Sequence, residues 1–441
     1  MKTCKSRICL EVMKKLKEKL EILISKGLFH IFGSNVINSA IAFITNILIV
    51  NFLTKTEYGI FSYANNALSI FSLATGLGLN SGLLQYCSEK RVASEKASFF
   101  KYGFKIAIGF NILLGGVIWG YGRYANIAIQ ESARYIQMLL FLPVLEIIYN
   151  LIAIILRTQK ENIKYSRLLN FNTITYSLFS CIGAGIGGIP GTILGRYISF
   201  MCSIIVGCFM CKNEIKAIRI ATRLEHNKKK SLLKYSGICC ASNSISQLLY
   251  LLDVFLIGVF IIDSSVIASY KVATLIPTAL TFIPSGIMVF IYPYFAENNK
   301  NIVWIKEKMI LLFKVLAVLN LFISVGLFIF APLIIKMLWG DDYMDSLIPF
   351  RILAINYFFT ATIRIPCGNI LAMLRMVKVN LVVSIVSGVA NVILDILLIK
   401  MAGSNGAALA TLLVVLISSV IMGSYLLIVL NKKDRWKDNN I

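Results

Sequence analysis

The sequence predicts an all-α polytopic membrane protein with about twelve transmembrane helices. Hydrophobic residues make up 58% of the 441 residues and charged residues 15%, and the mean hydropathy is +0.78. Soluble domains are nearer about 45–50% apolar and about 25% charged. The apolar residues form runs of twenty or more, which is the length a helix needs to cross a bilayer. The basic residues lie in short segments between these runs, so the composition fits a membrane protein better than a nucleic-acid-binding one.

Twelve apolar segments follow one another along the chain, with edges set to about three residues. They are 28–53, 59–86, 100–121, 134–156, 166–187, 190–211, 235–262, 266–295, 309–331, 347–373, 379–401 and 405–430. We therefore predict an N-lobe of six spans over 28–211 and a C-lobe of six spans over 235–430.

The remaining segments are basic. Residues 1–27 carry Leu and Met at helical spacing among eight Lys/Arg, which predicts an amphipathic helix on an anionic membrane surface. Residues 212–234 are predicted to link the lobes, and 431–441 to form a tail. The termini and alternate loops hold 35 of the 44 Lys/Arg. The positive-inside rule then predicts that both termini and the linker are cytoplasmic.

A weak internal repeat supports two related lobes. Phe61-Ser-Tyr-Ala64 resembles Tyr270-Lys-Val-Ala273, and Gly188-Ile-Pro-Gly191 with Gly195 resembles Gly403-Ser-Asn-Gly406 with Ala410. The spacings are 209 and 215 residues. Chance similarity of small residues in apolar helices is the alternative. If the repeat is real, two pseudo-symmetric six-helix lobes bind substrate between them and rock alternately.

Four oxygen-bearing side chains are predicted to meet in the C-lobe. Asn391 and Asp395 are four residues apart and share a helix face. A turn near 401–404 places Asp395 and Thr411 at the same depth, roughly 10 Å from the turn, and Asp253 lies roughly 13 Å deep. Intramembrane carboxylates are costly and mark functional sites. Hard oxygen ligands suit Na⁺, whereas two close carboxylates can instead share a proton. A purely structural pairing of Asp253 with Lys271 is the alternative.

Three cations inside or near spans are candidates for binding a substrate diphosphate. Lys271 and Arg364 lie in the eighth and tenth spans and Arg196 lies near the start of the sixth. Arg binds phosphate oxygens through two parallel hydrogen bonds, while Lys acts as a point charge. Pro366 follows Arg364 and is expected to open the helix locally. The alternative is that these long side chains reach out to the membrane interface.

The sequence shows no catalytic constellation, so we predict a protein that is not an enzyme and needs no organic cofactor. Its two histidines, His30 and His226, have no triad partners. Cys208-x-x-Cys211 has metal-like spacing, but no second pair or neighbouring His completes a site. The glycines between Thr75 and Gly82 are better explained by close helix packing.

The chain resembles the Wzx-type polysaccharide flippases, which carry O-antigen and capsule repeat units, of the multidrug/oligosaccharidyl-lipid/polysaccharide exporter superfamily. The resemblance lies in Phe52-Leu-Thr-Lys-Thr-Glu-Tyr-Gly59, Gly76-Leu-Gly-Leu-Asn-Ser-Gly82 with Tyr86, Leu338-Trp-Gly340 with Tyr343, and Asn391-Val-Ile-Leu-Asp395 with Gly403-Ser-Asn-Gly406-Ala-Ala-Leu-Ala-Thr411.

The resemblance implies two six-helix lobes in a V, as in MATE transporters. It also implies movement of a lipid-diphosphate-linked oligosaccharide across the bacterial cytoplasmic membrane, for surface polysaccharide synthesis beside glycosyltransferases and a polymerase. Related lipid II flippases build a sodium site at positions matching Asp253, Asn391, Asp395 and Thr411, completed by a carbonyl near Ala407. They also use charges of the first lobe that are lacking in the first span here.

Two other functions fit the same architecture. A cation-coupled multidrug exporter of the same superfamily is one, although basic residues in the cavity would disfavour cationic drugs. A non-transporting membrane scaffold for glycan assembly is the other, and it would have no use for paired intramembrane charges.

Overall fold

A computed structural model describes residues 28–89, 91–297, 302–374 and 376–438, and these residues are helical throughout with short connections and no strand. The predicted amphipathic helix over 1–27 and the last residues of the predicted tail, 439–441, lie outside the described residues.

The N-lobe contains six crossings, two of them bent. Its helices are α2 (Leu28–Phe52), α3 (Lys55–Ser72), α4 (Leu79–Ser88), α5 (Ala93–Tyr124), α6 (Ala133–Met138), α7 (Leu142–Thr158) and α8 (Asn162–Met210). A short 3₁₀ turn, Thr75–Gly78, joins α3 to α4 with a bend of 41°, and α6 meets α7 at 44°. Each bent pair therefore forms one broken span.

The C-lobe follows a short helix of the linker, α9 (Lys212–Ile220). Its helices are α10 (His226–Ile261), α11 (Ser264–Ala279), α12 (Phe282–Glu297), α13 (Ile302–Trp339), α14 (Leu347–Phe359), α15 (Ile365–Met373) and α16 (Val377–Asp438). α10 begins inside the segment predicted as linker, so the linker runs without a break into the first helix of the C-lobe.

The two longest helices, α8 and α16, are each two spans joined by a glycine turn. Gly188 has φ 57° and ψ −138°, and Gly403 has φ 58° and ψ −134°. The chain doubles back at each turn, so that the two arms of the hairpin touch. A Cβ on Gly183 would lie 2.1 Å from the Gly191 carbonyl oxygen, and a Cβ on Gly406 would lie 1.9 Å from the Leu398 carbonyl oxygen.

The structure confirms the predicted fold class, and the predicted number of twelve spans agrees approximately. Seven described helices are long and apolar enough to cross a membrane, or up to nine with the bent pairs. Counting α8 and α16 twice and adding the apolar end of α10, Leu251–Ile261, brings the number to about twelve.

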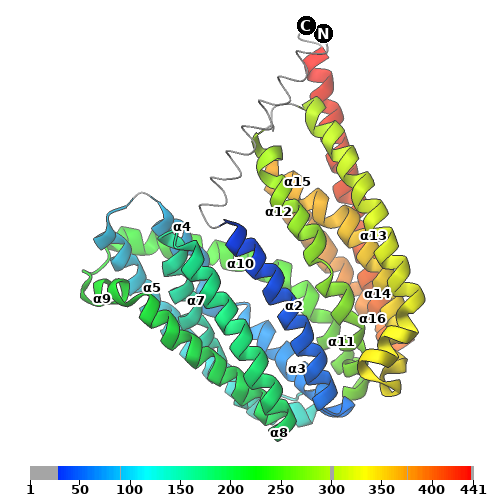
Figure 1. Cartoon of the computed structure of the whole chain (residues 1–441), viewed down its shortest axis with the longest axis horizontal. Coiled ribbons are helices and arrows are strands. Elements are labelled where there is room, and N and C mark those ends of the chain that lie inside the picture. Colours follow the sequence, from blue (N-terminus) through cyan, green and yellow to red (C-terminus); the bar gives the residue numbers. More distant parts are fainter. Residues whose placement is uncertain (1–27, 90, 298–301, 375, 439–441) are drawn as a thin grey trace.

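The two lobes form a V (Figure 1). They diverge at the end that carries α9, the start of α10 and the end of α15, which we call the basic end, and they converge at the other, which we call the opposite end. Packing follows this shape, since one buried cluster at the opposite end includes Tyr63 of α3 together with Ile257 and Tyr270. Separate clusters fill the N-lobe and the C-lobe toward the basic end.

Contacts between the lobes at the opposite end are close. A Cβ on Gly59 of α3 would lie 1.8 Å from the Ser264 carbonyl oxygen of α11. Lys55 Nζ lies 2.7 Å from Asp345 Oδ2 and also donates to the Asp342 carbonyl at 2.7 Å. Only glycine, which has no side chain, permits the contact between Gly59 and the Ser264 carbonyl oxygen. Gly59 is therefore required for the lobes to close at the opposite end.

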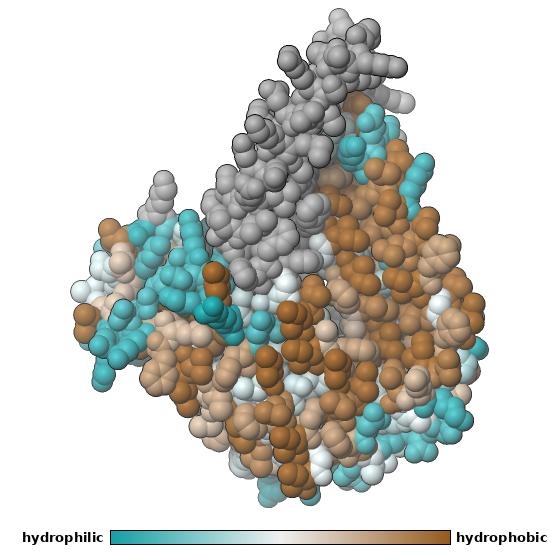
Figure 2. All heavy atoms as spheres, viewed as in Figure 1, coloured by the Kyte–Doolittle hydropathy of each residue, from teal (hydrophilic) through white to brown (hydrophobic). Residues whose placement is uncertain are grey.

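The outer surface has the pattern expected of a protein in lipid. Figure 2 shows hydrophobic residues along the sides of both lobes, with hydrophilic residues gathered at the basic end of the N-lobe and at the opposite end. On α13, for example, Leu311, Val315 and Phe322 are exposed at helical spacing. A stripe of this kind is stable facing acyl chains and costly facing water.

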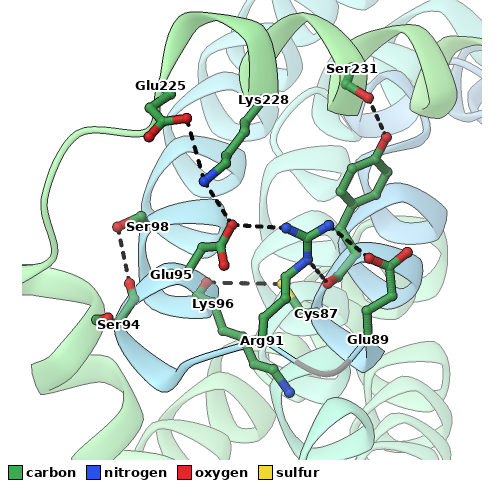
Figure 3. Close-up of polar contacts among 11 residues, drawn as sticks. Cys87, Glu89, Arg91, Ser94, Glu95, Lys96, Ser98, Glu225, Lys228 and Ser231 are labelled. Carbon is green, nitrogen blue, oxygen red and sulfur yellow. Dashed lines mark hydrogen bonds and ion pairs between the residues drawn. The ribbon is translucent and has the colours of Figure 1, made fainter.

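Charged residues tie the linker to the N-lobe at the basic end (Figure 3). Lys228 Nζ of α10 lies 3.0 Å from Glu95 Oε1 and 3.4 Å from Glu225 Oε2, and Arg91 bridges Glu89 and Glu95 at 2.7 and 2.8 Å. The hydrogen bond to Glu95 raises the pKa of Lys228. The ammonium therefore stays protonated at physiological pH, and the attraction is lost only when the pH rises through that raised value.

Gly188→Ala is expected to destabilise the protein by about 1–3 kcal/mol, because a side chain strains a backbone in this glycine-only region. Thermal unfolding in detergent measures the effect. Gly187→Ala is the matched control, since its new Cβ meets nothing within 4 Å. Equal melting temperatures for the two variants would contradict the role given to the turn.

Lys55→Ala is expected to shift the population away from the closed opposite end by up to about fivefold, since an exposed ion pair contributes roughly 0.2–1 kcal/mol. Spin labels at Asn213 and Glu307, on α9 and α13, report the separation of the lobes at the basic end. Lys336→Ala is the control, because Lys336 pairs with Asp341 within the C-lobe at 3.1 Å. An unchanged distance distribution in Lys55→Ala would show that the pair does not hold the closure.

Candidate functional site

Three helices bring a cluster of polar side chains together inside the C-lobe. α10 supplies Asp253, α11 supplies Tyr270, and the two arms of α16 supply Asn391 with Asp395 and Thr411. Tyr270 and Thr411 donate hydrogen bonds to Asp253 Oδ2 at 2.6 and 2.7 Å. Asn391 Nδ2 donates to Asp395 Oδ2 at 3.0 Å. The glycine turn at Gly403 is what returns Thr411 to the depth of Asp395.

The two carboxyl groups are buried and lie within hydrogen-bonding reach of each other. Asp253 is 8% exposed and Asp395 is fully buried. In the described part of the chain, Asp395 Oδ1 has no hydrogen-bond partner. Two buried carboxylates this close repel each other unless a proton or a cation lies between them. The cluster therefore needs one positive charge that its hydrogen-bond donors do not supply.

Thr411 has a single hydroxyl proton but two acceptors within reach. Its Oγ1 lies 2.7 Å from Asp253 Oδ2 and 3.1 Å from the Ala407 carbonyl oxygen. When the proton turns to Ala407, the lone pairs of the hydroxyl become available to a cation. The structure thus brings together all five residues predicted for the ion site, namely Asp253, Asn391, Asp395, Ala407 and Thr411.

The donor set of the cluster is oxygen from carboxylates, an amide, hydroxyls and a carbonyl. Hard cations prefer such ligands, whereas zinc and copper take nitrogen and sulfur. No group of three or more His, Cys, Asp or Glu able to hold a metal occurs among the described residues. The donor set therefore fits a hard cation such as Na⁺, or a shared proton.

The predicted cations do not form one group. Lys271 is half-buried beside the cluster, where its charge acts on Asp253. Among the described residues, no ion pair joins Lys271 to Asp253. Arg364 ends a π-helical turn, Thr360–Arg364, two residues before Pro366. The helix is thus locally opened there, as the proline predicts.

Arg196 lines a cavity that is open on one side. This cavity has a volume of about 350 Å³ and is lined by Leu68, Ser69, Ser72, Glu146, Arg196, Gln247 and Leu251. Arg196 also donates to Asn65 Oδ1 at 3.1 Å. These residues come from α3, α7, α8 and α10, so the cavity lies between the N-lobe and the first helix of the C-lobe.

α10 connects the cavity to the carboxylate cluster. Gln247 and Leu251 line the cavity, and Asp253 follows two residues later. The Leu251 carbonyl accepts a hydrogen bond from Asn66 of α3 at 2.9 Å. A movement of α10 therefore acts on the cavity and on the cluster together.

Sequence reasoning missed Tyr270 and the cavity role of Gln247. Tyr270 stands directly before Lys271 in the repeated Tyr270-Lys-Val-Ala273 stretch, and that repeat was the only available signal. Nothing in the sequence shows that its hydroxyl reaches Asp253. Glu146 lies within the apolar segment 134–156, and the sequence gives no indication of the cavity that it lines.

Tyr270→Phe is expected to lower the free energy of unfolding by about 1.5–3 kcal/mol, because the variant loses a hydrogen bond to a buried carboxyl group. Thermal unfolding in detergent checks the value. Tyr149→Phe is the control, since the buried Tyr149 hydroxyl has no partner among the described residues. The same loss in both variants would mean that the bond to Asp253 contributes nothing specific.

Comparisons with solved structures agree with this fold. A structure described as "Lipid II flippase MurJ, inward closed conformation" matches with a TM-score of 0.71 at 15% identity, covering 89% of this chain and 86% of that chain. An inward-facing multidrug resistance MATE family transporter of the MOP superfamily matches with 0.72 at 12% identity, covering 90% and 96%. An outward-facing MATE family structure matches with 0.60 at 13% identity, covering 93% and 96%.

The sequence itself matches one family. No curated protein sequence matches the chain, but the family model described as "Polysaccharide biosynthesis protein" matches residues 24–299. That match covers more than half of the chain, and the fold is shared with a lipid II flippase and with MATE transporters. This multi-pass membrane protein therefore belongs to the polysaccharide biosynthesis protein family.

Proposed function

We propose that this protein is a flippase that moves a polyprenyl-diphosphate-linked oligosaccharide from the inner to the outer leaflet of the bacterial cytoplasmic membrane. It works without catalysis, by ion-coupled alternating access, and serves surface polysaccharide synthesis beside glycosyltransferases and a polymerase. The observation that carries the proposal is the single helix α10, which connects a polar cavity between the lobes to a buried carboxylate cluster.

The shape supports loading from the cytoplasm. The lobes diverge at the basic end, and the positive-inside rule assigns basic segments, and with them both termini, to the cytoplasmic side. The opposite end is closed by α3 against α11, with Gly59 at the closest approach. Rocking of the lobes would break this contact and close the basic end, which exposes the cavity to the outer side.

The coupling ion is Na⁺ or H⁺, bound among Asp253, Asn391, Asp395, Ala407 and Thr411. Binding of either supplies the positive charge that the two carboxyl groups need. Because Tyr270 and Thr411 connect this cluster to α11 and α16, its occupancy changes the packing of the helix that closes the opposite end. A ligand that binds one conformation better shifts the population toward it.

The diphosphate is assigned to Lys271 and Arg364, and not to Arg196, which shares its cavity with the carboxylate of Glu146. Arg364 sits at an opened helical turn and Lys271 beside the cluster. A cationic side chain within a membrane span is costly unless it pairs with an anion, such as a diphosphate.

A cation-coupled multidrug exporter is the second candidate, and Glu146 in the cavity favours it because a carboxylate attracts cationic drugs. Vesicles separate the candidates. A flippase moves polyprenyl-diphosphate sugars and ignores ethidium, whereas an exporter does the reverse. If the protein moves neither compound, the remaining candidate function is a non-transporting scaffold for glycan assembly. In cells, deletion should cause the lipid-linked precursor to accumulate inside.

Asp395→Asn is expected to reduce gradient-driven movement of a polyprenyl-diphosphate sugar at least about fivefold, since coupling free energies are typically about 1–3 kcal/mol. The measurement uses vesicles with an imposed Na⁺ or pH gradient, and the gradient that drives wild-type movement identifies the ion. Glu131→Gln, an exposed acid far from the cluster, is the control. Undiminished gradient-driven movement in Asp395→Asn would exclude the cluster as the coupling site.

A further inference from the structure

The cavity between the lobes contains two opposite charges that do not pair with each other. Glu146 of α7 and Arg196 of α8 both line it. Arg196 donates to Asn65, and within the described ranges the Glu146 side chain forms no ion pair or hydrogen bond. Both residues are half-buried at the middle of the bundle, since Arg196 lies roughly 12 Å from the turn at Gly188. A carboxylate in such a place is expected to face a ligand or a wet cavity.

The rest of the lining is polar but uncharged. Ser69 and Ser72 of α3 contribute hydroxyls, and Gln247 of α10 contributes an amide. The cavity volume of about 350 Å³ is at the lower end of the range of about 300–1,000 Å³ that holds small molecules. The space therefore suits one compact polar unit with both donors and acceptors.

We propose that this cavity binds one neutral, hydroxyl-rich sugar ring of the transported head group. Glu146 accepts hydrogen bonds from the sugar hydroxyls, while Arg196 and Gln247 donate to them. The assignment rests on the proposed flippase function and names which part of the substrate this cavity holds.

Charge decides between the possible occupants. Glu146 and Arg196 cancel, so the cavity has no net charge to attract a diphosphate, and Glu146 would repel one. Arg196 would repel a cationic drug in the same way. A hydroxyl group both donates and accepts, so a neutral sugar satisfies both residues at once. A sugar acid would place its carboxylate close to Glu146, which selects against it.

Binding of three lipids to the purified full-length protein tests the proposal. The probes are a short-chain polyprenyl diphosphate without sugar, the same lipid with a neutral hexose, and the same lipid with a hexuronic acid. The wild type is expected to bind the hexosyl lipid about tenfold more tightly than the uronosyl lipid. In Glu146→Gln, which keeps the shape of the side chain, this preference falls at least about fivefold and the sugar-free lipid binds as before.

Gln247→Ala provides a second variant on an exposed face of α10, where loss of folding is not a concern. It is expected to weaken binding of the hexosyl lipid alone. Asn243→Ala is the matched control, because Asn243 lies on the same face but lines the neighbouring cavity with Tyr235 and Gln85. Its affinities should match those of the wild type.

The remaining outcomes separate the two proposals. If the wild type binds all three lipids equally, or if Glu146→Gln alters the sugar-free lipid as much as the hexosyl one, the cavity is not a sugar site and only this inference is overturned. If the wild type binds none of the three lipids, the proposed flippase function fails, and the sugar site fails with it.

Discussion

The central constraint on this protein is the burial of two carboxyl groups, Asp253 and Asp395, within reach of each other in a low-dielectric bundle. Such a pair is tolerated only with hydrogen bonds and one additional positive charge. Tyr270, Thr411 and Asn391 provide the hydrogen bonds. The packing of α10, α11 and α16 follows from this requirement, because each helix must bring its polar side chain to one depth.

The same helices carry the contact between the lobes. Ser269, next to Tyr270 on α11, donates to Asp345 Oδ2 at 2.8 Å, and Asp345 pairs with Lys55 of the N-lobe. Tyr63 of α3 fits against the bare backbone of Gly258 on α10, five residues beyond Asp253. The cluster and the closure at the opposite end are therefore linked through directly packed neighbours.

The sequence predicts the features that depend on local composition. Long apolar runs identify the spans, and the spacing of Asn391, Asp395 and Thr411 around Gly403 identifies their common depth, because a helical hairpin fixes depth by residue number. Features that depend on contacts between distant segments were not predictable. The hydroxyl of Tyr270, the bends between α3 and α4 and between α6 and α7, and the meeting of α7 and α8 at the cavity all require knowledge of which helices are neighbours.

The two lobes share a hairpin but differ in what it holds. The turns at Gly188 and Gly403 have nearly the same backbone angles. In the N-lobe hairpin, the positions eight residues before and after the glycine turn hold Ser180 and Arg196, where the C-lobe hairpin has Asp395 and Thr411. The buried carboxylate cluster therefore lies at the C-lobe hairpin, while the N-lobe hairpin contributes Arg196 to the cavity, which Glu146 of α7 also lines.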